Sequence, residues 1–124
     1  MENKENVILE LSYEFALQII EYTELLEEKK KHVIARQLLK SGTSIGANIN
    51  EAQNAESKAD FIHKLKISAK EANETDYWLK LCIKAQSYPN PDGLQDMLLS
   101  IQKLLTKIIY TTKSNNHHSK YSNN

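Results

Sequence analysis

The scarcity of turn-forming residues is the strongest constraint that this chain places on its fold. Its 124 residues contain only three glycines and two prolines. Apart from Gly42 and Gly46, these residues lie together between Pro89 and Gly93. A β-sandwich or barrel needs a turn about every 8–12 residues, so both architectures are excluded. The sequence predicts a few long helices in one domain, because a chain of this length has room for a single core.

Four segments of the chain repeat apolar residues at intervals of three and four, the spacing that gives a helix one buried face. Short stretches connect them, so each helix is expected to run antiparallel to the one before it. We therefore predict an all-α protein whose residues 1–112 form an antiparallel up-down-up-down four-helix bundle. The predicted helices cover residues 6–30, 32–54 and 57–86, with a fourth helix from a cap at Asp92 to Thr112.

The ends of these segments carry recognisable signals. Ser57 and Asp60 have the N-cap and N3 spacing of a capping box, with Asp in place of Glu, so the third helix should start there. After Thr112 the chain is almost entirely Ser, Asn, His, Lys and Tyr. Such a segment buries too little apolar area to offset its ordering entropy. We expect residues 113–124 to be a disordered polar tail.

The chain shows no sign of export or of membrane insertion. Residues 1–6 are acidic and polar, unlike the start of a signal peptide, and no run of about 18 apolar residues exists. The single cysteine, Cys82, allows neither an intramolecular disulfide nor a cysteine-based zinc site. We expect a cytoplasmic protein that does not contact a membrane.

No arrangement of residues typical of catalysis stands out. A di-iron site in a four-helix bundle needs two Glu-x-x-His pairs, and only Asp60 with His63 approaches that pattern. The segment from Gly42 to Gly46 lacks the Lys-Ser or Lys-Thr ending of a phosphate-binding loop. Cys82 has no histidine partner placed by the sequence, which favours a buried, inert thiol. We predict no catalytic residue, no metal site and no cofactor.

Two glycines, Gly42 and Gly46, lie four residues apart on one face of the second helix. Each glycine costs about 1 kcal/mol relative to alanine in a helix interior, so packing must compensate for it. We predict close helix packing at both positions, where a neighbouring backbone or a bulky aromatic side chain approaches the second helix.

Polar and aromatic residues lie on or beside the apolar stripes of the second and third helices. Buried polar groups in a bundle must be paired, which favours an interhelical hydrogen-bond network that fixes the register; a ligand or subunit contact is the alternative. Adjacent aromatic residues can stack a nucleic-acid base, but at helical spacing a core or interface anchor is the favoured interpretation. The residues concerned are Ser44, Asn48, Glu51, Glu74, Tyr77 and Trp78.

The first helix is more apolar than a single bundle core requires. Leu9, Leu17, Ile20 and Leu25 widen its stripe beyond the inner face. An apolar surface of this kind indicates a second partner. We expect another subunit to cover it.

The charges balance over the whole chain but not within it. There are 16 Lys and Arg against 16 Asp and Glu, whereas residues 1–28 carry eight Glu and one Lys, a net charge of −7 that leaves +7 on the rest. The asymmetry favours pairing of the first helix with its neighbours; alternatively, it leaves a basic surface for nucleic acid while an acidic one meets the adjacent subunit. The candidate nucleic-acid contacts are Lys29, Lys30, Lys31, Arg36, Lys40, Lys58, Lys64, Lys66 and Lys70.

Two segments, 40–52 and 57–81, carry a recognisable combination of residues. The first combines Lys40, three small residues, Ser44-Ile45 and Asn48-Ile49-Asn50-Glu51; the second combines Ser57-Lys58, Phe61, Leu65, Ala69 and residues 74–79. They resemble the bacterial four-helix bundle proteins first noted as open reading frames within intervening sequences of 23S ribosomal RNA genes. Leu39 stands where many members have a second basic residue, which weakens a nucleic-acid contact there, and Ala52 stands where many have glycine.

This resemblance implies a non-enzymatic bundle that self-associates as a pentamer, with a role undefined for most members. Its relatives include the accessory bundle protein of diversity-generating retroelements, a pentameric ring that associates with a reverse transcriptase and nucleic acid. We therefore expect a homo-oligomeric interaction protein whose partner is itself. The alternative is an RNA- or DNA-binding accessory factor that uses basic faces of the second and third helices.

Overall fold

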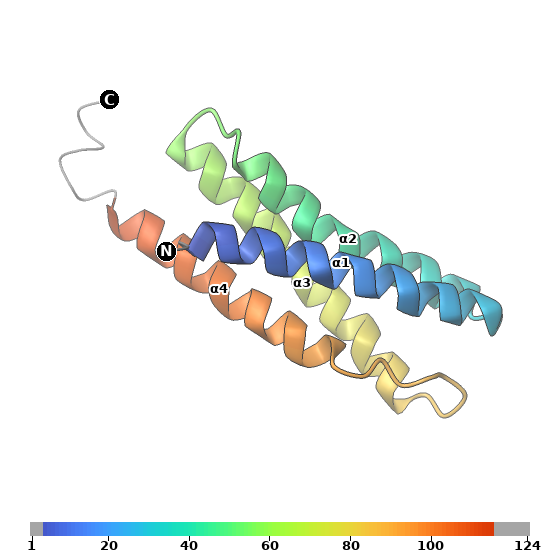
Figure 1. Cartoon of the computed structure of the whole chain (residues 1–124). Coiled ribbons are helices and arrows are strands. Elements are labelled where there is room, and N and C mark those ends of the chain that lie inside the picture. The colour runs from blue at the N-terminus through green and yellow to red at the C-terminus, as the bar shows by residue number, and fades with distance from the viewer. Residues whose placement is uncertain (1–3, 116–124) are drawn as a thin grey trace.

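A computed structural model of the chain describes residues 4–115, with side chains from residue 7 onward (Figure 1). Within those residues the chain forms four helices and no strand, which confirms the prediction of an all-α, four-helix protein. The helices are α1 (Lys4–Glu28), α2 (His32–Ala52), α3 (Lys58–Lys84) and α4 (Leu94–Asn115).

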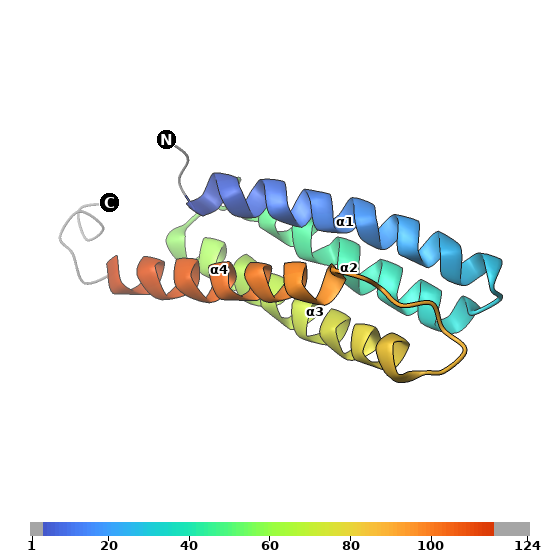
Figure 2. The same ribbon diagram turned by 60° about the horizontal axis from the view of Figure 1, so that its bottom comes forward.

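Each helix packs against two others, α1 on α2, α2 on α3, α3 on α4 and α4 on α1. The contacts of α2 with α1 and α3 are more extensive than those of α4. In Figures 1 and 2, the connections α1–α2 and α3–α4 lie at one end of the molecule and the connection α2–α3 lies at the other. This arrangement is compatible with the predicted up-down-up-down order.

The turn after α1 ends that helix two residues before the predicted end. Lys30 adopts a left-handed backbone conformation, with φ of 63°. The Lys31 N–H then donates to the carbonyl of Leu26 at 2.8 Å, and the Lys30 N–H donates to the carbonyl of Glu27 at 2.9 Å. These two bonds form a Schellman motif, which satisfies carbonyls at the helix end and usually has glycine at the left-handed position.

The ends of α3 and α4 follow local chemistry. The Ser57 hydroxyl accepts a hydrogen bond from the Asp60 N–H at 3.0 Å, so the predicted cap of the third helix is confirmed. The Asp60 carboxylate accepts in turn from the Glu56 N–H at 3.1 Å. Helix α4 continues to Asn115, three residues beyond the predicted end, so the first part of the expected tail is helical. The rest of that tail, 116–124, lies outside the described residues.

The core is built from the inner stripes of all four helices. Phe15, Ile45, Leu79 and Leu98 are among its fully buried side chains. Full burial of a side chain of this size contributes about 1.5–3 kcal/mol relative to exposure. Hydrophobic burial along these stripes therefore holds the four helices together.

Candidate interaction surfaces

The two glycines of α2 face α1. A Cβ atom at Gly42 would lie 3.0 Å from both Cγ atoms of Ile19, and one at Gly46 would lie 3.3 Å from the hydroxyl and 3.4 Å from the carbonyl oxygen of Ser12. The neighbour is therefore an aliphatic side chain and, at Ser12, the backbone of α1 itself. The small residues let α1 and α2 approach closely.

The polar residues that we expected to join the helices bond mainly within their own helices. The Asn48 side-chain amide donates to the carbonyl of Ser44 at 2.8 Å, and the Ser44 hydroxyl donates to the carbonyl of Lys40 at 2.6 Å. Glu74 accepts from the indole N–H of Trp78 at 3.1 Å, one turn further along α3. The expected interhelical network therefore does not form at these residues.

Among the polar residues expected to join the helices, Glu51 is the one that forms an ion pair with another helix within the described part of the chain. Its carboxylate lies 3.8 Å from the ammonium of Lys64, which also lies 3.9 Å from Asp60. Glu51 is exposed, and a surface pair of this kind contributes about 1 kcal/mol or less.

Hydroxyl groups join α2 and α3 in place of the expected residues. Ser41 and Thr75 are buried, and their hydroxyl oxygens lie 2.9 Å apart in a hydrogen bond. The hydroxyl of Ser68, also buried, donates to the carbonyl of Ile45 at 2.9 Å. These residues could have been found from the sequence, because a serine or threonine inside an apolar stripe needs a partner when it is buried.

Of the aromatic pair, Tyr77 lies at the surface and Trp78 packs against the core. Tyr77 and Trp78 meet edge to face, with ring centroids 5.2 Å apart. Tyr77 is 57% exposed and Trp78 is half-buried. The structure does not place Tyr77 as an anchor within the bundle, so an interface role remains a prediction.

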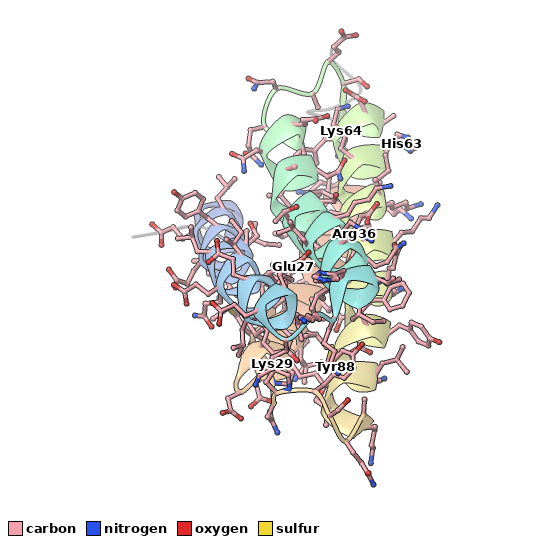
Figure 3. All side chains as sticks on the ribbon, turned by 90° about the vertical axis from the view of Figure 1, so that its right-hand side faces the viewer. Glu27, Lys29, Arg36, His63, Lys64 and Tyr88 are labelled. Carbon is pink, nitrogen blue, oxygen red and sulfur yellow. The ribbon has the colours of Figure 1, made fainter. Side chains whose placement is uncertain are left out.

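The nine candidate cations lie on several separate surfaces. Lys29 lies in the α1–α2 turn and Arg36 near the start of α2, whereas Lys64 lies near the start of α3, at the other end of the molecule (Figures 1 and 3). Lys64 contacts two carboxylates, and the ammonium of Lys58 is buried. Lys30 and Lys31 belong to the α1–α2 turn, and there the Lys31 ammonium lies 5.1 Å from the ring centroid of Tyr88. The structure therefore does not gather these cations into one patch.

Two of the cations, Lys66 and Lys70, are exposed on α3 on the side that faces α4. Here the two helices are tied by a hydrogen bond from Gln102 to Asn73 at 3.2 Å. Lys66 also approaches Lys113 of α4. As a hydrogen-bond donor and a cation beside it, Lys66 favours the neutral amine and lowers the pKa of Lys113. Lys113 belongs to the predicted tail, so this cationic neighbour was missed.

The outer face of α1 carries apolar side chains that the bundle does not cover. Tyr13 is 65% exposed, Leu17 is 41% exposed and Ile20 is 38% exposed. Leu9, four residues before Tyr13, is half-buried. Tyr13 was not among the predicted residues, although its spacing from Leu9 and Leu17 places it on the same face. We call these four residues the α1 outer stripe.

Leu25 is also exposed but does not belong to this stripe. It lines a small open hollow of about 240 Å³ together with Tyr22 and residues 90–92 of the α3–α4 connection. The Tyr22 hydroxyl donates to the carbonyl of Pro89 at 2.6 Å and ties this connection to α1.

The buried thiol of Cys82 lies next to Tyr22. Burial raises the pKa of both groups, which disfavours the reactive thiolate at neutral pH. His63, the other residue weighed for chemistry, is exposed (Figure 3). Across residues 4–115, no three His, Cys, Asp or Glu side chains gather in a way that would hold a metal ion. In the same part of the chain, none of the helices combines the length and apolar character needed to cross a membrane.

Comparison with known proteins gives one family and a structural relative. The model of the family described as 23S rRNA-intervening sequence protein matches residues 4–111. A crystal structure of a protein of unknown function from the S23 ribosomal protein family of Bacteroides thetaiotaomicron is 47% identical, with a TM-score of 0.81. That match covers 87% of this chain and 99% of the other. No curated protein matches the chain.

Proposed function

This chain belongs to the 23S rRNA-intervening sequence protein family, and from that premise we propose that it is a non-enzymatic bundle protein that works by associating with copies of itself. The observation that carries the proposal is the α1 outer stripe. The inner face of α1 already fills the core with Phe15, Ile19 and Leu26, so the bundle has no further use for a second apolar face. Exposed apolar residues grouped along one helix are typical of an interaction site.

The proposed assembly is a homopentamer of antiparallel up-down-up-down bundles in the cytoplasm. The order of the connections in Figure 1 supports the bundle topology. The resemblance to the pentameric accessory bundle protein supports the subunit number. The single free cysteine supports a reducing compartment, because it allows no intramolecular disulfide.

Native mass spectrometry, with light scattering after size-exclusion chromatography, tests this proposal on the full chain. We expect a complex of five subunits at micromolar concentration. Only monomer at that concentration would overturn the proposal of self-association. A stable complex of another size would keep self-association and overturn the subunit number.

Binding of RNA or DNA by basic faces of α2 and α3 is the second candidate function. It is the weaker one, because its cations are spread over several surfaces and Lys64 already contacts two carboxylates. Lys66 and Lys70 are the members that support it, since further lysines of α4 lie on the neighbouring helix. A titration with single-stranded RNA should give a log affinity that falls linearly with log salt. Absence of binding, or a flat salt response, would exclude this function.

A further inference from the structure

The outer face of α1 is acidic as well as apolar. Residues 7–28 contain six glutamates and no lysine or arginine. Three of the four residues of the α1 outer stripe are followed directly by a glutamate, as in Tyr13-Glu14 and Ile20-Glu21. The next residue along a helix lies about 100° around its axis, so these exposed glutamates flank the stripe. Any partner of α1 therefore meets an apolar ridge with a row of negative charges beside it.

The charges oppose a symmetric contact in which the α1 helices of two copies face each other. Such a contact would place glutamates opposite glutamates, and like charges across an interface cost several kcal/mol. The partner of the α1 outer stripe is thus expected to be apolar and basic, which α1 itself is not.

The outer side of α4, next to α3, has that character. On α4, Asp96 is the only acidic residue of the helix, and three lysines follow it. Leu99 is 49% exposed and Tyr110 is 72% exposed, so apolar groups alternate with these cations. An open hollow of about 570 Å³ lies between them, lined by Gln102, Lys103, Thr106, Lys107 and Tyr110. We call this area the basic α3–α4 surface, made of Lys66, Leu99, Lys103, Lys107, Tyr110 and Lys113.

Resting on the self-association proposed above, we propose that the α1 outer stripe of one copy packs against the basic α3–α4 surface of the next copy. The glutamates beside the stripe then face the lysines of α4, and Tyr13, Leu17 and Ile20 cover Leu99 and Tyr110. The two surfaces match in length as well. Leu9 to Ile20 and Leu99 to Tyr110 each span eleven residue steps, which is about 16 Å of helix.

This contact joins two different surfaces, one on each of two copies of the chain, so it is heterologous. In an open row of copies, one end copy keeps a free α1 outer stripe and the other end copy keeps a free basic α3–α4 surface. A heterologous contact generates a ring where its rotation closes and a filament where it does not. The exposed apolar residues favour a protein partner over nucleic acid here, because phosphate contacts use cations and leave Leu99 without a role.

Charge reversal on each surface tests the pairing. One variant combines Glu14→Lys with Glu21→Lys on α1, a second combines Lys103→Glu with Lys107→Glu on α4, and a third carries all four changes. The control reverses two exposed lysines outside both surfaces, with Lys29→Glu and Lys84→Glu. Circular dichroism and thermal unfolding of each variant verify that it is folded. Dilution series followed by light scattering give the dissociation constant of the subunits.

We expect each double variant to raise the dissociation constant about tenfold or more, the combined variant to restore it, and the control to leave it unchanged. Association of the wild type should also weaken as sodium chloride increases. A wild type that is monomeric would overturn both the proposed function and this inference. A wild-type oligomer that survives Lys103→Glu with Lys107→Glu would overturn the inference alone. If this variant keeps the oligomer but loses binding to a short single-stranded RNA, the basic α3–α4 surface would be assigned to nucleic acid.

Discussion

The hydroxyls of Ser41 and Thr75 meet at 2.9 Å between α2 and α3, with both side chains buried. Thr75→Val leaves the Ser41 hydroxyl buried without this hydrogen bond, which costs about 1–3 kcal/mol. In Ser41→Ala the Thr75 hydroxyl keeps a second bond, to the carbonyl of Glu71 at 2.7 Å. We expect Thr75→Val to lower the free energy of unfolding in this range and Ser41→Ala to lower it by less. The double variant should lose less free energy of unfolding than the two single variants lose together. The difference, measured by urea denaturation, is a coupling energy of about 0.5 kcal/mol or more. Strict additivity would show that the bond does not couple the helices.

Helix α1 limits the size of the side chain that α2 can have at position 42, where it has Gly42. A Cβ atom there would lie 3.0 Å from two atoms of Ile19 that are attached to its own Cβ and have little freedom to move. Overpacking costs about 1–3 kcal/mol, against a gain of about 1 kcal/mol in helix propensity from glycine to alanine. We expect Gly42→Ala to destabilise the protein in thermal unfolding. Gly46→Ala, with its nearest contact at 3.3 Å, is the matched control and should cost less.

The left-handed conformation of Lys30 offers a stabilising substitution. Its φ of 63° is unfavourable for a residue with a Cβ and is readily adopted by glycine. We expect Lys30→Gly to raise the free energy of unfolding by about 0.5–1 kcal/mol. Lys29→Gly removes the same charge one residue earlier, where φ is not positive, and should destabilise the protein. A loss of stability in Lys30→Gly would show that Lys30 makes compensating contacts.

The α1 outer stripe should tolerate a charge in the folded monomer but not in the assembly. Leu17→Arg is expected to leave the helix content unchanged, since Leu17 is 41% exposed, and to shift the protein toward smaller species in size-exclusion chromatography. The control is Val33→Arg, which adds the same charge at a position that is 67% exposed on α2. An assembly of unchanged size in Leu17→Arg would argue against a role of the stripe.

Because the cations Lys66 and Lys113 are neighbours, we expect the free energy of unfolding to depend on pH. Lys66 lowers the pKa of Lys113 in the folded protein, so the unfolded chain binds the proton more tightly. This unfavourable contribution is present at neutral pH and is relieved as the pH rises through the lowered pKa of Lys113. Titration of the Lys113 side chain by NMR should give a higher pKa in Lys66→Gln and no change in Lys84→Gln. An unchanged pKa in Lys66→Gln would remove Lys66 as the cause.

Periodicity and capping chemistry predicted the helices but not all of their ends. Ser57 was predicted as a cap because a hydroxyl three residues before Asp60 can bind the free N–H groups of a helix start. The end of α1 at Lys30 was missed, since glycine is the usual signal for a left-handed residue and this chain has lysine there. The extension of α4 to Asn115 was missed because its last residues are polar and carry no apolar period.

The sequence alone determined the four helices, their inner faces and the second apolar face of α1, because side-chain spacing along a helix is a local property. Only the tertiary structure decided which groups meet across helices. Asn48 and Glu74 bond within their helices, whereas Ser41 reaches Thr75 and Lys66 reaches Lys113. Those pairings depend on the register and closeness of neighbouring helices, which the glycine contacts of α2 with α1 help to set. A single helix period contains no information about register between helices.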